Sequence, residues 1–320
     1  MSNEFTERSK NVKDKLFGQA AFDVEHAIGM YATSYCTIPA EGIYEKDQLE
    51  SLKPVVEKCH IYLIGYTPRI DLVQVEQKER LLVLHFQILG KHHSISYELP
   101  DGLTLSREGE DYFLQDSKGE RFWPDAVEMQ SRLSAKSKAI GFEVKYIGQA
   151  YGDGGSRNAL DRLLKHETLQ KIALKGAPVD HRITLLLLEI QPSNQLITMM
   201  NPYAQNTEDG PSRIRQGLDK LYNTSEAERI SLYEAALIRY FYPDFNKEFK
   251  DSFPSTNLKI LQDCYEKDFA AVIAEICIDE LPFHLWSSSV PPKLRHLAKH
   301  DLHREDDRRI FFNRQPLQAP

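Results

Sequence analysis

The chain has 320 residues, of which 41% are hydrophobic and 27% are charged, so it can build a core and is not globally disordered. This length predicts two domains, or two domains and a tail. No apolar run reaches the roughly 20 residues of a membrane span, and the polar N-terminus lacks the apolar stretch of a secretory signal. The four cysteines form no C-x-x-C pair, which predicts buried thiols in a reducing cytoplasm.

The net charge of −7 hides a basic segment in the middle of the chain. Residues 132–182 contain ten basic and five acidic side chains, so this segment carries +5 and the remainder −12. A basic segment in an acidic chain favours a phosphate-bearing ligand, although charged surfaces are more often simply solvated.

The N-terminal part is expected to contain one helix followed by strands. Phe17, Ala20, Ala21, Val24 and Ile28 recur at three- and four-residue steps, which predicts a helix in the first 30 residues. Short runs rich in β-branched and aromatic residues then alternate with Gly, Pro and Asp breakers, which is typical of antiparallel strands. These predicted strands span 60–66, 70–75, 81–89 and 93–99, with a further hairpin at 110–115 and 120–123.

After residue 125 the pattern changes to alternating helices and strands. A capping box, Ser225 with Glu228, predicts the start of one helix, and Pro243 its end. The expected elements are helices at 126–137, 156–173, 225–242 and about 258–278, strands at 141–148 and 183–190, and a polar loop at 201–212.

Arg162 and His166 form the first candidate site. On one helix they would lie about 40° apart, with Leu160 and Leu164 on the opposite side facing a core. An arginine fork and an imidazole four residues later can contact one phosphate group, where the histidine offers a donor or a proton-transfer group. The common alternative for such a pair is a solvated helix face.

Glu234 is the second candidate, because it stands among apolar residues of the helix at 225–242. A carboxylate in apolar surroundings needs a cation, a polar partner or a path to water. Mg²⁺ is one such cation, since it often binds through one or two carboxylates together with water and phosphate. The alternative is an amphipathic helix on which Glu234 points to solvent.

In order, these pieces resemble the GIY-YIG nuclease superfamily, in its restriction-type and homing-type branches. The stretches that carry the resemblance read KYIGQAYGDGGSRNALDRLLKH, HRITLLLLEIQ and YEAALIRYFYPDFN, within residues 110–250. The resemblance implies hydrolysis of nucleic acid with one divalent ion. It assigns water activation to Tyr146, compensation of charge in the transition state to Arg162 and His166, metal binding to Glu234, and structural positions to Gly148 and Asn246.

The sequence departs from this pattern in two places. Tyr146 precedes Arg162 by 16 positions, longer than the family's spacing, and Arg157 has the better spacing but no histidine four residues later. The strand with the first tyrosine is also missing just upstream of Tyr146. A literal Gly-Ile-Tyr at 42–44 is far away in sequence and is interpreted as chance, so Tyr112 is the preferred candidate.

The predicted fold is therefore α+β, with a β-rich domain (1–105), a small three-stranded GIY-YIG-type nuclease domain (106–255) and a helical, basic extension (256–320). The expected function is Mg²⁺- or Mn²⁺-dependent endonuclease cleavage of DNA in restriction, repair or defence, with RNA as a second substrate class. The expected location is cytoplasmic, and a homodimer is compatible with the sequence. Arg157, Lys165 and Lys171 are expected to contact nucleic acid. The rival function is a catalytically silent nucleic-acid-binding or sensor protein.

Overall fold

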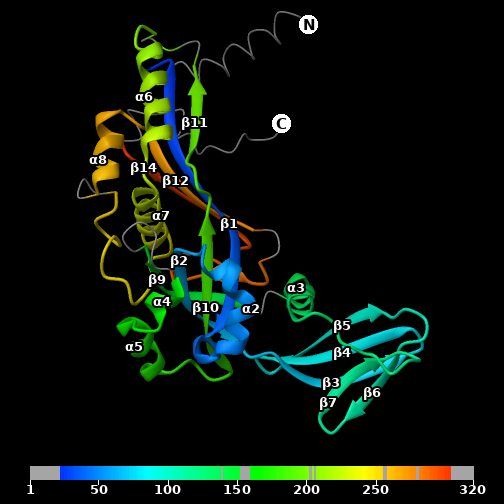
Figure 1. Cartoon of the computed structure of the whole chain (residues 1–320). Coiled ribbons are helices and arrows are strands. Elements are labelled where there is room, and N and C mark those ends of the chain that lie inside the picture. Colours follow the sequence, from blue (N-terminus) through cyan, green and yellow to red (C-terminus); the bar gives the residue numbers. More distant parts are fainter. Residues whose placement is uncertain are drawn as a thin grey trace, which may run out of the picture.

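A mixed eight-stranded sheet forms the centre of the computed structural model, which describes residues 22–303 except 138–139, 152–158, 202–203, 205–206, 255–257 and 279–280. The strand order is β13-β9-β2-β10-β1-β12-β14, and β11 also pairs with β1. The long strand β1 (Val24–Pro39) runs through the middle of the molecule and joins the two halves of the sheet (Figure 1).

Strand β1 has partners on both sides. One side pairs with β10 (His181–Ile190) and β11 (Gln195–Met200), both antiparallel, and the other pairs in parallel with β12 (Ala271–Cys277). Seven successive residues at the start of β1 are buried, because both of its faces are covered there. Such a strand shows no alternation of apolar and polar residues, so its sequence does not reveal it as a strand. Val24 and Ile28, which were expected in a helix, lie in β1 instead. The remaining residues of that prediction, up to 21, lie outside the described residues.

In the other half of the sheet, two strands that are distant in sequence pair with each other. Strand β2 (Ile61–Pro68) lies between β9 (Gly141–Gln149) and β10, and both pairings are antiparallel. The short strand β13 (His284–Trp286) extends β9 in parallel. The predicted strands at 60–66, 141–148 and 183–190 are therefore confirmed.

A β-rich lobe is inserted between β2 and β9, and it projects from the central sheet (Figure 1). It contains two three-stranded antiparallel sheets, and helix α3 (Ala126–Lys136) packs against the first of them. Its strands are β3 (Asp71–Lys78), β4 (Leu81–Ile88), β5 (Lys91–Glu98), β6 (Thr104–Glu108), β7 (Asp111–Gln115) and β8 (Arg121–Phe122). The strand pairings confirm the hairpins expected in this region. These hairpins could be predicted because Gly and Asp residues mark their turns.

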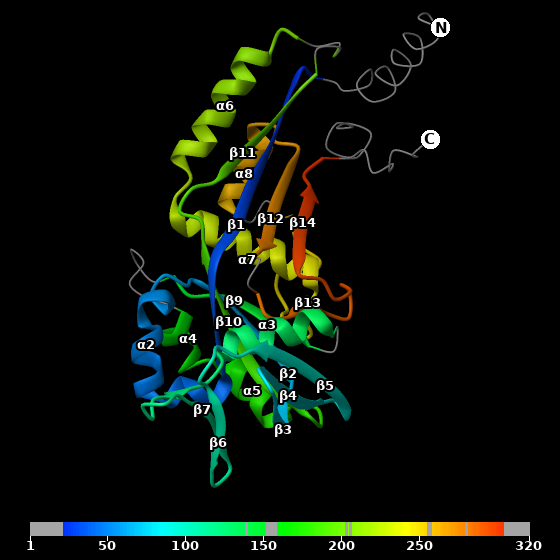
Figure 2. The same cartoon turned by 90° about the vertical axis from the view of Figure 1, so that its right-hand side faces the viewer.

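Helices cover both faces of the central sheet. One face, with Tyr62 and Leu187, packs on α2 (Lys46–Val56), α4 (Ala159–Leu163) and α5 (Glu167–Lys175). The other face packs on α7 (Glu226–Phe241) and α8 (Lys259–Glu266). Helix α6 (Gly210–Asn223) lies along β1 and β11 (Figure 2). The predicted capping box of α7 is present, with Ser225 and Glu228 bonded in both directions.

The predicted fold class is wrong in two respects. The strands expected in a small three-stranded domain belong to the eight-stranded sheet, which also takes strands from before residue 106 and after residue 255. The expected helical extension is largely strand. Helix α8 ends at Glu266, and β12 and β14 (Arg295–Asp301) pair antiparallel behind it. The cause is long-range pairing, because β12 completes its hydrogen bonds with a strand about 240 positions earlier in the chain.

Candidate active site

A β-bulge in β9 turns Tyr146 towards the face that carries α4 and α5. The pairing of β2 with β9 shifts between Ile64, opposite Tyr146, and Gly65, opposite Val144, so Lys145 is the extra residue. Without the bulge, Tyr146 would share the face of Val144, because side chains alternate along a strand. Any Cβ at Gly65 would lie 2.2 Å from the Phe142 ring, so this close approach of the two strands requires glycine.

Tyr62 on β2 lies directly opposite Gly148 on β9. A Cβ at Gly148 would lie 2.5 Å from the Tyr62 hydroxyl, so the glycine leaves the space that the phenol ring fills. This explains the structural position assigned to Gly148. It also places a second tyrosine beside Tyr146, which the sequence alone did not indicate.

Tyr62, Tyr146 and His166 form a compact group of rings. The centroid of the His166 ring lies 5.1 Å from that of Tyr146 and 5.5 Å from that of Tyr62, and the two tyrosine rings are 6.2 Å apart. The Tyr62 hydroxyl is 3.0 Å from His166 Nε2. Tyr62 and His166 are buried, whereas Tyr146 is half-buried and so reaches the surface.

The helix predicted at 156–173 is broken between Arg162 and His166. Helix α4 ends at Leu163, and His166 is the N-cap of α5, where its Nδ1 accepts a hydrogen bond from the Leu169 backbone N–H at 3.3 Å. The helical-wheel expectation is therefore wrong. Leu163 is the buried leucine of this segment and Leu164 is 40% exposed. Arg162 and His166 still interact electrostatically, but they belong to two helices rather than one.

Arg162 is exposed at the edge of this group and acts on each of its members. The positive charge of its guanidinium favours the ionised forms of Tyr62, Tyr146 and Glu234. Burial, followed by the positive charge of Arg162, lowers the pKa of His166. His166 is consequently neutral at pH 7 and supplies hydrogen bonds rather than positive charge, so among the described residues Arg162 is the cation that acts on this group.

Asn246 completes the outer edge of β9. Its amide pairs in both directions with Ile147, accepting from the backbone N–H at 2.9 Å and donating to the carbonyl at 2.8 Å. The Phe245 N–H bonds the Lys145 carbonyl at 3.0 Å beside it. The segment after α7 therefore satisfies a strand edge that β13 does not reach, which explains the structural position assigned to Asn246.

Glu234 lies on α7 next to the same stretch of β9 and is half-buried. Burial, followed by the negative charge of Glu248, raises the pKa of Glu234 to about 8, against a hydrogen bond from the Gln149 backbone and the charge of Arg162. Its charge in turn contributes to a raised pKa of Tyr146. This carboxylate is therefore short of positive charge, which is the expected state of a ligand for a cation.

The donor set around Glu234 fits one hard divalent ion. Among the described residues, no group of three or more His, Cys, Asp or Glu side chains could enclose a metal. A closed zinc site therefore has no basis in these residues, whereas Mg²⁺ and Mn²⁺ bind through one or two carboxylates, with water and phosphate in the remaining positions. Glu234 would hold such an ion, and the exposed Glu248 is the nearby second carboxylate.

Other predicted site residues lie elsewhere. Tyr112 is on β7 in the inserted lobe, 5.1 Å beneath the Arg107 guanidinium, so the structure does not bring it to Tyr146. Lys165 is exposed in the turn between α4 and α5, and Lys171 is exposed on α5 and pairs with Glu167 at 3.3 Å. Arg157 lies outside the described residues.

The sequence search missed Tyr62 because it looked for a glycine two positions before the first tyrosine. That position is His60. The usable signal was the Ile61-Tyr62 pair at the start of a predicted strand. The literal Gly42-Ile43-Tyr44 forms a 3-10 helix (Ala40–Tyr44), where Tyr44 is 70% exposed.

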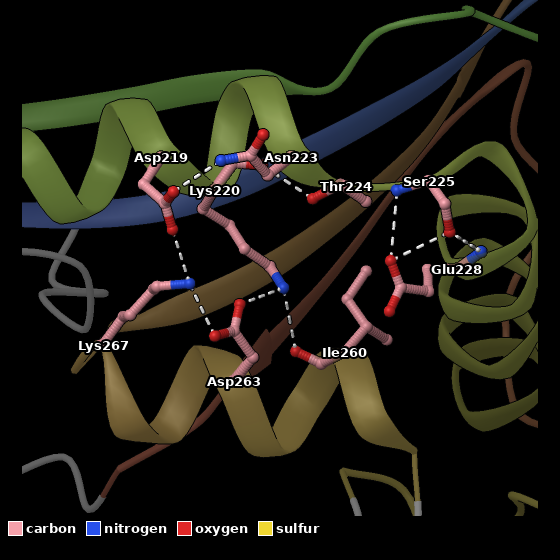
Figure 3. A network of polar contacts seen from close by, with 9 residues as sticks. All are labelled: Asp219, Lys220, Asn223, Thr224, Ser225, Glu228, Ile260, Asp263 and Lys267. Atoms are coloured by element: carbon pink, nitrogen blue, oxygen red, sulfur yellow. Dashed lines mark hydrogen bonds and ion pairs between the residues drawn. The ribbon is translucent and has the colours of Figure 1, made fainter.

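A hollow of about 390 Å³ lies between α6 and α8, and none of the residues that line it belongs to the tyrosine group. Figure 3 shows the polar contacts of this region. The hollow is lined by charged side chains that pair with one another, including Lys220 with Asp263 at 2.6 Å and Lys267 with Asp219 at 2.8 Å. Asp219, Lys220, Asp263 and Lys267 therefore already have protein partners.

No helix in the described part of the chain is long and apolar enough to cross a membrane. All four cysteines are unpaired thiols, and three of them are buried. In comparisons with known proteins, no family model, no curated protein and no solved structure matches this chain.

Proposed function

We propose that this chain is a metal-dependent nuclease that hydrolyses phosphodiester bonds of DNA. The observation that carries the proposal is the meeting of Tyr62, Tyr146, Arg162, His166 and Glu234, which come from β2, β9, α4, the start of α5 and α7. Binding alone would need the arginine but not a carboxylate with a raised pKa beside two tyrosines.

Each residue has a distinct part in this proposal. Tyr146, half-buried and next to Glu234, orients the attacking water, and the Tyr62 ring packs beside it. Arg162 binds a phosphate oxygen and stabilises the charge that grows there in the transition state. His166 keeps Tyr62 in place through its 3.0 Å contact. When bound at Glu234, Mg²⁺ or Mn²⁺ would supply Lewis-acid stabilisation of phosphate and leaving group.

The resemblance to GIY-YIG nucleases supports the proposal at the level of these residues. Gly148 gives room to the Tyr62 ring and Asn246 closes the edge of β9, so both positions have a physical reason in this chain. Tyr62 replaces Tyr112 as the proposed first tyrosine. Membership of this superfamily is thus part of the proposal, carried by the motifs and the side-chain cluster.

The second candidate is a silent nucleic-acid-binding or sensor protein with the same residues. One observation favours it: both tyrosine pKa values are raised, by burial first of all, so neither phenol is ionised at pH 7. A bound divalent ion opposes that effect, because positive charge favours the phenolate. The two functions therefore differ in whether cleavage appears when metal is added.

We further propose DNA as the main substrate, with RNA as the alternative, and the cytoplasm as the location. Restriction, repair or defence is the proposed context. Four unpaired cysteines suit a reducing compartment. The charge of Arg162 and the exposed Lys165 lie beside the tyrosine group and would meet the phosphate backbone. A homodimer is an open proposal for the assembly.

A nicking assay tests this function. Supercoiled plasmid and single-stranded RNA of matched length are incubated with the full chain in Mg²⁺, Mn²⁺ or EDTA. The proposal expects nicking of the plasmid in either metal and none in EDTA. Retarded migration of the plasmid without any nicking, in every metal, would contradict it and favour the silent binding protein.

A further inference from the structure

Both ring nitrogens of His166 have a partner in the structure. Nδ1 accepts from the Leu169 backbone N–H at 3.3 Å, and Nε2 lies 3.0 Å from the Tyr62 hydroxyl oxygen. A backbone N–H is only a donor, so Nδ1 must carry a lone pair. A neutral imidazole has a single N–H, which is therefore on Nε2.

The cap that imposes this tautomer is unusual. Helix N-caps are preferentially Ser, Thr, Asp or Asn, and His166 holds this position in α5 with an extended backbone. The helix itself is fixed on the sheet by the buried residues Leu169 and Ile172. The imidazole thus spans from the first turn of α5 to Tyr62 on β2.

The Tyr62 oxygen then receives a hydrogen bond from His166, which donates through Nε2–H. The single proton of Tyr62 is therefore not used in this contact. The Tyr146 ring lies beside Tyr62, with the two ring centroids 6.2 Å apart.

We propose that His166 is a positioning residue, held by the cap of α5 as the Nε2–H tautomer, which donates to Tyr62 and fixes the orientation of the Tyr62 hydroxyl. The tautomer follows from the contacts of His166 alone, whereas its use in positioning Tyr62 rests on the proposed nuclease function. His166 therefore does not take a proton from Tyr62. The Tyr62 proton is in turn left for water or substrate.

The tautomer is measured directly by nitrogen-15 NMR of the full chain, labelled at histidine, without metal or DNA. The expected spectrum at pH 7.5 has a pyrrole-like Nε2 and a pyridine-like Nδ1 for His166, assigned with His166→Ala. The same tautomer should persist in Tyr62→Phe, because the cap remains. A protonated Nδ1 in the wild type, or a tautomer that changes in Tyr62→Phe, would overturn the proposal.

Two substitutions separate the cap from the contact with Tyr62. His166→Asn keeps a favoured N-cap, but the amide ends near the position of Nδ1 and does not reach Tyr62. We expect the Leu169 amide to stay protected from hydrogen exchange in His166→Asn and to lose protection in His166→Ala. Cleavage should fall about tenfold or more in both. Wild-type cleavage by His166→Asn would contradict the positioning role.

The two measurements also separate this inference from the proposed function. If the wild type cleaves no nucleic acid in any metal, the nuclease proposal fails, while the spectra still confirm or reject the tautomer. If the wild type cleaves and the spectra show a protonated Nδ1, the nuclease proposal stands and this inference is wrong.

Discussion

Two groups of charged and polar side chains in this molecule differ in how their charges are balanced. Between α6 and α8, Lys267 pairs with Asp219 and Asp263, and the buried Lys220 pairs with Asp263 (Figure 3). In the tyrosine group, Glu234 has Glu248 as a negative neighbour, and the exposed Arg162 is the cation that acts on it among the described residues. The acidic side chains Asp219 and Asp263 of the first group are paired with lysines, whereas the described surroundings of Glu234 leave its pKa raised.

The pKa directions express this difference. Burial alone would raise the pKa of Asp263, but Lys220 and Lys267 outweigh it and lower that pKa. Burial and Glu248 raise the pKa of Glu234 to about 8. The first arrangement means that ionised Asp263 stabilises the folded protein. Ionised Glu234 destabilises the folded protein unless a cation binds. Asp219, Lys220, Asp263 and Lys267 form what we call the clamp, because their ion pairs join α6 to α8 and the residue that follows it. The tyrosine group, by contrast, has the features of a site.

A large expected effect on cleavage follows from a pair of tyrosines on β2. Tyr62→Phe keeps the ring over Gly148 but removes the hydroxyl that contacts His166, so single-turnover cleavage should fall about 10²–10³-fold. Tyr66→Phe is the matched control, because its hydroxyl only donates to the Gly176 carbonyl at 3.3 Å. Equal cleavage rates for Tyr62→Phe and Tyr66→Phe would contradict a specific role of Tyr62 in cleavage.

The clamp should matter for stability and not for cleavage. Lys220→Met leaves Asp263 without its nearest buried cation, and the free energy of unfolding should fall by about 2–3 kcal/mol. Replacing both residues, as Lys220→Met with Asp263→Leu, should recover most of this loss. Urea unfolding measures both, and cleavage per folded molecule should be unchanged. A loss of cleavage in a fully folded Lys220→Met would show that the hollow between α6 and α8 contributes to cleavage.

The pH dependence of stability has opposite signs in the two groups. The lowered pKa of Asp263 contributes stability above its unfolded value near 4, which is lost as the pH falls through the lower folded pKa. Glu234 binds its proton more tightly in the fold, so its contribution is present at low pH and is lost between about pH 4.5 and 8.

Glu234→Gln should therefore remove part of the decline in stability towards pH 8. Since the side chain keeps some contact with water, we expect the variant to be roughly 2–3 kcal/mol more stable than the wild type at pH 8, and equally stable at pH 4.5. Addition of Mg²⁺ should raise the melting temperature of the wild type only. A constant difference across this pH range would show that Glu234 is not the titrating group.

The smallest expected effect concerns nucleic-acid binding by lysines near the site. Each phosphate contact contributes about −0.9 to the slope of log affinity against log salt on duplex DNA. Lys165→Ala should flatten the slope by about this amount. Lys171→Ala should flatten it less, because Glu167 already lies 3.3 Å from its ammonium. Slopes equal to that of the wild type for both variants would place the DNA elsewhere.

The sequence predicted well those elements whose signals are local. The capping box of α7, the strand at 141–148 and the hairpins of the lobe each depend on a few neighbouring residues. The central sheet could not be predicted in this way. Its strand β1 is buried on both faces at its start and has no period of two, and β12 pairs with it from the far end of the chain.

The site was predicted in part for the same reason. Tyr146, Arg162 and Glu234 lie in recognisable local motifs, but Tyr62 becomes their neighbour only through the pairing of two strands with a lobe inserted between them. The break after Leu163 was also missed. The helical periodicity continues across 164–166, while the cap that starts α5 is an imidazole, which is not among the usual N-cap residues.

The central claim is that Glu234 makes this group a metal-dependent phosphodiesterase. It is tested most directly by single-turnover cleavage and DNA binding of Glu234→Gln in Mg²⁺. The control is Glu266→Gln, at the end of α8, where Glu266 lines the hollow between α6 and α8. The account predicts that Glu234→Gln folds and binds DNA like the wild type but cleaves about 10³-fold more slowly, while Glu266→Gln cleaves normally. Cleavage by Glu234→Gln at the wild-type rate would contradict it.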